Sequence, residues 1–332
     1  MLGAAPFQMV ERGHYDLLME FQPGGEHPGW HFHARRCLDF QLGACASEER
    51  IPLQDAIFAV PHRVQGQIPG GSAWEFLGSP GTPLYLLPES GSEAYQKDLV
   101  WLGLNTEDIP EGFFSGGLSG RGRVNLEFLG AEGSGPAQGG VFALFQFDRF
   151  GTPRSTEPAP LSSHPTWEGN NRVENIPVGA HAHYNWAMTA PGLYRLHFRI
   201  SGTARPEHGG GERAGEFTVH IHVADGRSPW GAAYLDESGW KRSPWLGFYY
   251  DAFDPFVRHE SFGWLYAIGE SPEALWLFDF QSAGWFFTSR HHYPHLYHFS
   301  SQSWLVYGKG TANPRWFYRY GDGWFAESEL SD

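Results

Sequence analysis

The sequence predicts an all-β protein: an antiparallel β-sandwich of the immunoglobulin-like or jelly-roll type, followed by a C-terminal module of aromatic-rich β-hairpins. Long helical periodicity is scarce, and most segments are short alternating or apolar runs bounded by turn residues. The 332 residues include 43 Gly and 24 Pro, which suits a chain of many short strands and turns. A chain of this length can bury a full core without disulfide staples.

The individual elements follow from the same pattern. Strands are clearest at 123–130 (RVNLEFLG), 140–148, 192–201 and 215–223. The one helix candidate is SEAYQKDLVWLGL at 92–104. Flexible connections are expected at 67–72, 115–123, 130–140 and 202–215. We interpret the last of these as a long hairpin loop, because it separates two strands.

Composition divides the chain into two predicted domains, 1–226 and 227–332. Nine of the fourteen tryptophans lie from Trp230 onward, in short aromatic segments separated by turn residues. One interpretation is that these rings stack on sugar rings of a carbohydrate or cell-wall polymer. The other, which we favour, is that they supply a core to a thin sheet, because buried aromatics usually serve packing.

Charge and hydropathy exclude several classes of partner. The 23 Lys and Arg residues stand against 37 Asp and Glu, so the formal charge is −14. This argues against nucleic acid or an anionic membrane surface, which need a basic face. No apolar run reaches the roughly 18 residues of a membrane helix, so no transmembrane segment is expected. The start, MLGAAPFQMVERGHYD, lacks the basic and apolar regions of a signal peptide.

The two cysteines, Cys37 and Cys45, lie eight residues apart. They form either a local disulfide in an oxidising compartment or two small buried side chains. Spacing does not choose between these alternatives.

Histidines form the most informative pattern. Three His-x-His pairs occur, at His31/His33, His181/His183 and His220/His222, and His14-x-Asp16 has the same spacing. Residues i and i+2 of a strand share a face, so two such side chains can converge on one ion. We predict His14, Asp16, His181 and His183 as the core ligands, with His31 and His33 next. A transition metal is the expected cofactor, zinc in preference to copper, with binding that weakens below about pH 6.

The other histidines have simpler explanations. His220 and His222 alternate with apolar residues, as on a half-buried strand with a polar outer face, and His197 extends another strand in the same way. The segment HHYPHLYH at 291–298 lies among turn residues and is not predicted as a site. His181 and His183 instead lie at a strand entry, where functional residues concentrate.

Three classes of function remain. The first is a metal-binding, envelope-associated protein without catalysis. The second is a metalloenzyme, but the chain lacks HExxH, GxSxG, Walker and GxGxxG motifs, and no catalytic residue is predicted. The third is a carbohydrate-binding or cell-wall-binding protein that uses the aromatic tail.

Residues 181–194 also resemble a repeat of a known domain family. His181, His183, Asn185, Trp186, Thr189, Pro191, Gly192 and Tyr194 resemble the HxHxNW…PGxY repeat of the choice-of-anchor M domain of bacterial surface-anchored proteins, with Met188 in place of the usual Phe. The similarity extends to Gly13, His14, Asp16 and Leu17 and to 100–110 and 135–153, so it covers about 10–225.

The resemblance implies an extracytoplasmic β-protein held at or near the cell envelope. It also implies metal-uptake ABC transporter components, or cell-envelope polymers, as partners of the metal-binding function. The C-terminal SELSD is not a sorting motif. The residues themselves add that Pro191-Gly192 forms a turn and that Tyr194 forms a tyrosine corner. In such a corner Trp186 packs below the strand entry, and Asn185 satisfies turn backbone.

Overall fold

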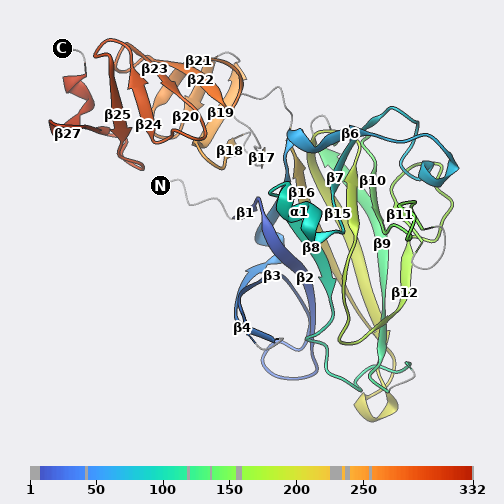
Figure 1. The fold of residues 1–332 in the computed structure, drawn as a ribbon. Helices are drawn as coiled ribbons and strands as arrows, with labels where there is room; N and C mark the ends of the chain where they lie inside the picture. The colour runs from blue at the N-terminus through green and yellow to red at the C-terminus, as the bar shows by residue number, and fades with distance from the viewer. Residues whose placement is uncertain are drawn as a thin grey trace. The chain divides into compact units, whose positions relative to one another are not determined.

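The structure is a computed structural model that describes residues 8–41, 44–117, 120–134, 137–154, 159–224, 234–235, 240–253 and 256–330. Contacts within the chain divide it into two compact units, Met1–Val223 and Ala224–Asp332 (Figure 1). Strands make up most of both units, which confirms the predicted all-β class. Within the described residues, no helix combines the length and the apolar character that crossing a bilayer requires.

Three sheets form the first unit, and their strands are given in spatial order. The first sheet has six strands: β1 (Gln8–Val10), β5 (Ala56–Val60), β16 (Glu212–Val223), β15 (Gly192–Thr203), β9 (Arg123–Ser134) and β12 (Arg172–Pro177). The second has five: β11 (Leu161–Ser162), β10 (Phe142–Phe145), β14 (Asn185–Met188), β7 (Pro83–Leu87) and β6 (Gln65–Gln67). The third also has five: β13 (His181–His183), β8 (Val100–Asn105), β2 (Gly13–Gln22), β3 (Gly29–Gln41) and β4 (Ala44–Pro52).

Helical segments in the first unit are short. They are α1 (Gly91–Gln96) and the 3-10 helices η1 (Leu53–Asp55), η2 (His62–Val64), η3 (Ser72–Trp74) and η5 (Pro206–His208). Ser90 caps α1 by accepting a hydrogen bond from the Glu93 amide. The expected helix at 92–104 is therefore wrong in its second half, which forms β8. Val100, Leu102 and Leu104 are buried there, and core burial overrides the local helical pattern.

One hydrophobic core joins the three sheets. Alternate residues of β2 face this core, among them Leu17, Met19 and Phe21, while His14 and Asp16 point to the opposite face. The second sheet contributes to the core from one side and packs a smaller apolar cluster on the other. The β-sandwich prediction agrees with this arrangement.

Two details differ from the expectations. The pairs β1/β5, β5/β16 and β2/β8 are parallel in an otherwise antiparallel unit. The connection expected at 130–140 begins later, because β9 continues to Ser134, where it pairs with β15. The hairpin at 202–215 is confirmed, but its strands extend further, from Gly192 to Thr203 and from Glu212 to Val223.

The structure decides between the two alternatives for Cys37. Cys37, on β3, is disulfide-bonded. The side chain of Cys45 lies outside the described residues.

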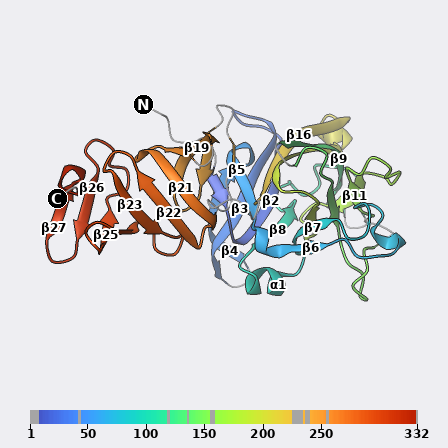
Figure 2. The same cartoon turned by 90° about the horizontal axis from the view of Figure 1, so that it is seen from above.

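The second unit is one antiparallel sheet in which each described strand pairs with the next along the chain (Figure 2). Its strands are β17 (Tyr234–Leu235), β18 (Lys241–Ser243), β19 (Gly247–Phe253), β20 (Phe256–His259), β21 (Gly263–Ser271), β22 (Ala274–Asp279), β23 (Gly284–Thr288), β24 (His295–His298), β25 (Ser303–Tyr307), β26 (Trp316–Arg319) and β27 (Gly323–Ala326). The 3-10 helix η6 (Glu327–Glu329) follows.

Leucines, phenylalanines and tyrosines form the core of this unit, with Leu277, Phe286 and Phe317 among them. No tryptophan belongs to that buried set within the described residues. The interpretation that the aromatic side chains of the tail supply the core holds for several phenylalanines and tyrosines, and partly buried Trp245 packs against the same core. Tryptophans on the strands, such as Trp276 and Trp304, alternate with core residues and so point to the other face of the sheet.

Candidate metal centre

Four of the six predicted ligands lie on one face of the third sheet. His14 and Asp16 are two residues apart on β2, and His181 and His183 are two residues apart on the edge strand β13. β8 lies between these strands and is hydrogen-bonded to both. Because Asp16 and His183 are each paired with Gly103 of β8, the two ligand pairs face each other across a single strand.

The four side chains converge on one volume. Each offers one ligand atom, and these atoms all lie within 4.8 Å of one another. His181 Nε2 is 2.8 Å from Asp16 Oδ1, and His14 Nε2 is 3.2 Å from the same oxygen. The centroids of the three imidazole rings are 4.9 to 5.5 Å apart. In the part of the chain that the structure describes, no other group of three or more His, Cys, Asp or Glu side chains is placed to hold an ion.

Gly103 makes this convergence possible. A Cβ atom built on Gly103 would lie 2.5 Å from Asp16 Oδ1, 2.8 Å from His183 Cε1 and 3.2 Å from His181 Nε2. Any side chain at this position would therefore fill the space between the ligands. Glycine inside a strand is typical of a point where another group approaches the backbone closely.

Trp101 lies two residues before Gly103 on β8, opposite His14, and supports the imidazoles. Its ring stacks on His183 with a centroid distance of 3.8 Å and an interplanar angle of 12°, and it lies 4.4 Å from the ring of His14. The Trp101 indole N–H donates to the carbonyl of Glu89, which fixes the ring. A stacked, anchored indole restricts the rotamers of the two histidines, and this holds them ready for coordination.

Asp16 is held in position by the side chains around it. Its carboxylate is buried, and Oδ2 faces Arg35 at 3.5 Å and the Asn105 amide at 3.4 Å. Arg35 and Asn105 also contact Glu107, at 2.7 and 2.9 Å. One oxygen of Asp16 is thus held by neighbouring side chains while Oδ1 points to the histidines, the arrangement in which surrounding groups orient a ligating carboxylate.

The electrostatics favour a cation. Burial opposes ionisation of Asp16, but the contacts with His14 and His181 outweigh it and hold the pKa of this carboxyl well below its usual range. The hydrogen bond to Asp16 raises the pKa of His181 against the effect of burial. Burial, with the nearby His14 and His181, lowers the pKa of His183 to about 4. Asp16 is therefore ionised and His183 neutral at physiological pH, as metal ligands must be.

His183 gives a further indication of a missing partner. Both of its ring nitrogens are buried, and within the described residues their one polar neighbour is the Leu102 backbone, at a geometry too poor for a full hydrogen bond. Buried polar atoms without partners are uncommon and call for an explanation. An ion bound by one of these nitrogens would satisfy it.

The donor set suits a transition metal. Three imidazoles and one carboxylate match the nitrogen and oxygen ligands of zinc, at distances of about 2.0–2.2 Å. A tetrahedral site of that size separates its ligand atoms by roughly 3.3–3.5 Å. The 3.2 Å contact of Asp16 Oδ1 with His14 is close to that range, and the 2.8 Å contact with His181 is a hydrogen bond that coordination would lengthen.

His31 and His33 do not join this group, although both lie on the same sheet. The β2/β3 register places Arg35 opposite Asp16, and His33 and His31 opposite Leu18 and Glu20. They are displaced from the group by two and four residues along the strand, about 7 and 13 Å. His31 Nε2 lies 2.7 Å from the carbonyl of His27 instead.

The corner predicted from the sequence is present and supports β13. The Tyr194 hydroxyl donates to the Ala190 carbonyl at 2.9 Å and accepts from the Ala190 amide at 3.0 Å. Trp186 is fully buried, and its indole N–H donates to the Leu102 carbonyl of β8 at 3.1 Å. Asn185 accepts from the Glu89 amide. The Trp186 bond ties the chain after His183 to the strand that carries Gly103.

The sequence reasoning missed the residues of β8 and their partners. Trp101 and Gly103 fall within the helix candidate 92–104, whereas Asn105 and Arg35 were not among the candidate residues. One signal was available: a single glycine interrupts the apolar run VWLGLN, and such a glycine inside a strand indicates close approach.

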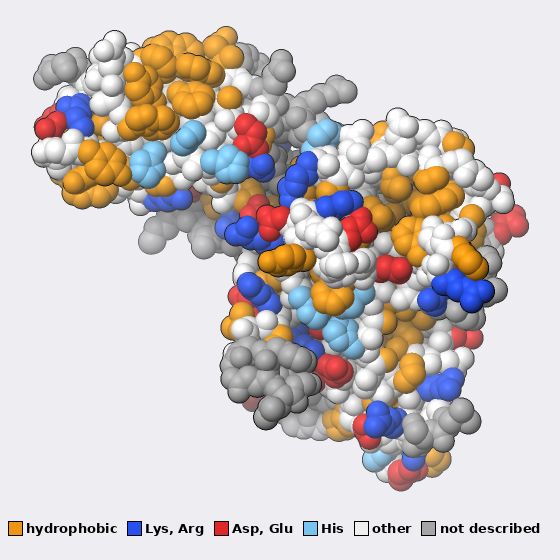
Figure 3. Space-filling model, viewed as in Figure 1, with side chains coloured by type: hydrophobic (Ala, Val, Ile, Leu, Met, Phe, Trp, Pro, Cys, Tyr) orange, Lys and Arg blue, Asp and Glu red, His pale blue; other side chains and the backbone are white. Residues whose placement is uncertain are grey.

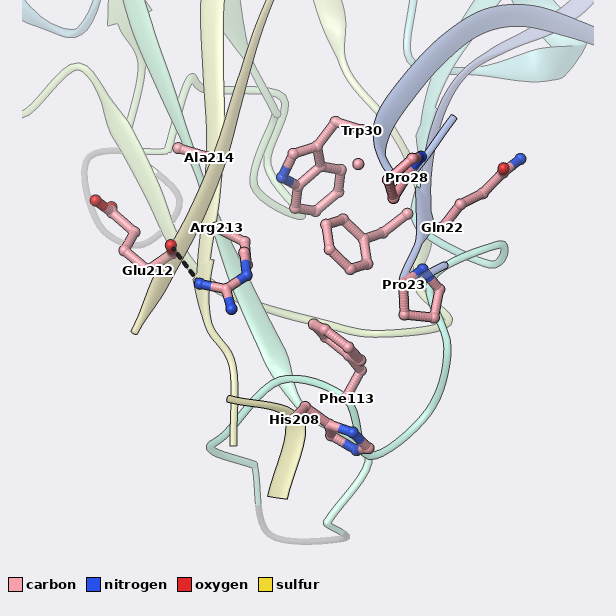
Figure 4. A pocket seen from close by; sticks show the side chains of 11 residues that line it. Gln22, Pro23, Pro28, Trp30, Phe113, His208, Glu212, Arg213 and Ala214 are labelled. Carbon is pink, nitrogen blue, oxygen red and sulfur yellow. Dashed lines mark hydrogen bonds between the residues drawn. The ribbon is translucent and has the colours of Figure 1, made fainter. Parts of the chain in front are cut away.

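A cavity of about 560 Å³ lies elsewhere in the first unit (Figure 4). In Figure 4 the ring of Trp30 lies above those of Phe113 and His208, with the Arg213 side chain at one side. None of the predicted ligands lines this cavity. It is near Gln22, at the far end of β2 from the ligands, about 20 Å from Asp16.

Fold and site together define an all-β protein with a candidate metal centre of three histidines and one aspartate. No family model, no curated protein and no solved structure matches the chain. The resemblance to the choice-of-anchor M domain therefore stays a prediction.

Proposed function

We propose that this protein binds a transition-metal ion, zinc in preference to copper, through His14, Asp16, His181 and His183. The observation that carries the proposal is the convergence of these four ligand atoms within 4.8 Å around the space left by Gly103. The neutral state of His183 and the ionised state of Asp16 add to it, because both are ready to coordinate without losing a proton.

The place of action that we propose is outside the cytoplasm, at or near the cell envelope. The resemblance supports this location, and so does the disulfide of Cys37, because disulfides persist mainly in oxidising compartments. Handing metal to, or receiving it from, components of a metal-uptake transporter is the role that the resemblance implies. Alkylation and mass spectrometry of the protein from its own cells test the location, and a reduced Cys37 would contradict it.

Metal analysis of untagged protein is the direct test of the site. We expect about one zinc per chain after equilibration with limiting zinc and copper, and loss of it in the double variant His181→Ala/His183→Ala. The matched control is His31→Ala/His33→Ala, which removes two other histidine side chains with the same spacing from the same sheet. The site is wrong if the two double variants retain metal equally.

A further inference from the structure

The sheet of the second unit has one face that is covered by aromatic rings. Alternation along β22 places Leu275 and Leu277 in the core and turns Trp276 and Phe278 to the other side. The same alternation on the neighbouring strands produces two lines of rings that cross the strands. This unit is distinct from the one that carries the candidate metal centre.

The first line crosses four consecutive strands. Trp276 of β22 is paired with Phe287 of β23, Phe287 with Tyr297 of β24, and Tyr297 with Trp304 of β25. The ring centroids of Trp276 and Phe287 are 4.9 Å apart, and those of Tyr297 and Trp304 are 5.6 Å apart. The paired residues lie about one strand spacing apart, and the planes of these two ring pairs are tilted by 56° and 64°.

The second line runs beside the first. Phe256 of β20 is paired with Tyr266 of β21, Tyr266 with Phe278, and Phe278 with Trp285. Ring centroids are 5.4 Å apart for Phe256 and Tyr266, and 5.4 Å apart for Phe278 and Trp285. We call the eight residues of these two lines the aromatic face. Figure 3 shows hydrophobic side chains gathered on this unit.

The aromatic face is partly open to solvent, because three of its eight rings are exposed and the other five are half-buried. Trp276, Trp304 and Phe256 are 39%, 38% and 44% exposed, which is far more than core residues of this size. A contiguous apolar patch of this kind marks an interaction surface in soluble proteins. The core of the unit is complete without these rings, because the buried leucines and phenylalanines lie on the other side.

The chemistry of the aromatic face indicates an uncharged ligand. Among the described side chains on this side of β21–β25 there is no Lys, Arg, Asp or Glu, although the chain as a whole has a net charge of −14. Arg258 of β20, paired with Trp264, and His295 of β24, paired with Val306, are the basic side chains on the same side of β20–β25 among the described residues. Across the middle of the face, a charged ligand would lose its hydration without gaining a partner of opposite charge. Ile268 and Val306 are the aliphatic residues with branched side chains among the same described set. The face is thus made mostly of flat aromatic rings.

We propose that the aromatic face binds a neutral polysaccharide, whose chain lies across the strands with pyranose rings stacked on the exposed rings of Trp276 and Trp304. The C–H groups on the flat side of a pyranose are weakly positive, and they match the negative face of an aromatic ring. The phenol groups of Tyr266 and Tyr297 and the indole N–H groups supply polar edges for sugar hydroxyls.

Affinity electrophoresis of the full chain tests this proposal, with hydroxyethylcellulose, galactomannan or xylan in the gel and alginate as a charged polysaccharide. We expect retardation by at least one of the neutral polymers and none by alginate. Trp276→Ala/Trp304→Ala is expected to weaken retention on the order of tenfold. Trp276→Tyr/Trp304→Tyr keeps the rings and is expected to retain most of it, which separates stacking from misfolding.

The matched control is Tyr95→Ala/Phe150→Ala, which removes two aromatic side chains of 88% and 77% exposure from the first unit. It is expected to migrate as the unsubstituted protein does. The proposal is overturned if no neutral polymer retards the protein, or if the Trp276→Ala/Trp304→Ala variant is retarded equally. It is also overturned if light scattering shows a dimer that this variant abolishes, because the face then joins two copies of the chain. Metal binding is measured separately, so failure of polysaccharide binding can be told apart from failure of the proposed metal site.

Discussion

His181 Nε2 lies 2.8 Å from Asp16 Oδ1, although 165 residues separate the two in the chain. This contact joins an edge strand to the centre of the third sheet, and it orients both side chains toward the space above Gly103. The pair therefore connects the two strands that supply the candidate metal ligands. His14 and His183 complete it from the same two strands.

Substitution of Gly103 tests where the ion sits. Gly103→Ala is expected to weaken zinc binding by about tenfold or more, because the new methyl group would press against Asp16 Oδ1 and the His183 ring. Isothermal titration calorimetry measures the change. Gly66→Ala is the control, since a Cβ there meets only the Leu84 carbonyl at 3.8 Å. Equal affinities in the two variants would place the ion elsewhere.

Zinc affinity is expected to fall as the pH is lowered. His181 has a raised pKa, so it takes up a proton at a higher pH than an ordinary imidazole of pKa about 6.5, and that proton competes with the metal. His183, with a pKa of about 4, adds no proton competition above that pH. Titrations between pH 8 and pH 5 should show the loss beginning above pH 6.5. A constant affinity across this range would contradict imidazole ligation.

Metal binding is expected to stabilise the first unit. An ion that binds only the folded state at about 100 times its dissociation constant contributes about 2.7 kcal/mol to the free energy of unfolding. Differential scanning calorimetry should show the transition of this unit rising by several degrees with zinc and returning with EDTA. The His181→Ala/His183→Ala variant should show no shift. An equal shift in that variant would mean that zinc stabilises through another site.

The tyrosine corner is expected to contribute measurably to stability. Tyr194→Phe removes the hydroxyl that serves both the amide and the carbonyl of Ala190. We expect a loss of about 1–3 kcal/mol in the free energy of unfolding of the first unit, from urea titration. Tyr95→Phe, at an exposed tyrosine, is the control and should be neutral. A neutral Tyr194→Phe would show that the corner is dispensable.

A buried ion pair is expected to stabilise the second unit. The fully buried Arg315 donates to Asp279 at 2.7 Å and also contacts Glu327. Arg315→Met leaves the buried Asp279 carboxylate without its cation, which should cost about 3–5 kcal/mol. Tryptophan fluorescence during urea unfolding measures the change, because nine of the fourteen tryptophans lie in this unit. Arg258→Met, at an exposed arginine, should have little effect. If both variants behave alike, the ion pair does not stabilise the fold.

Local patterns in the chain were sufficient for much of the architecture. The period of two in segments such as 192–201 and 215–223 predicted their strands, because alternation reflects one buried and one open face. The same period put His181 beside His183 and His14 beside Asp16. Pro191-Gly192 and Tyr194 predicted the corner, since these residues act through their near neighbours.

Long-range pairing accounts for what the sequence did not reveal. The parallel pairing of β2 with β8 and the antiparallel pairing of β8 with β13 bring the ligands together, and they leave His31 and His33 several residues away. Residues 100–104 form a strand because their apolar side chains are buried in a core built from distant segments. Strand order and register depend on that shared burial, which periodicity within a single segment does not encode.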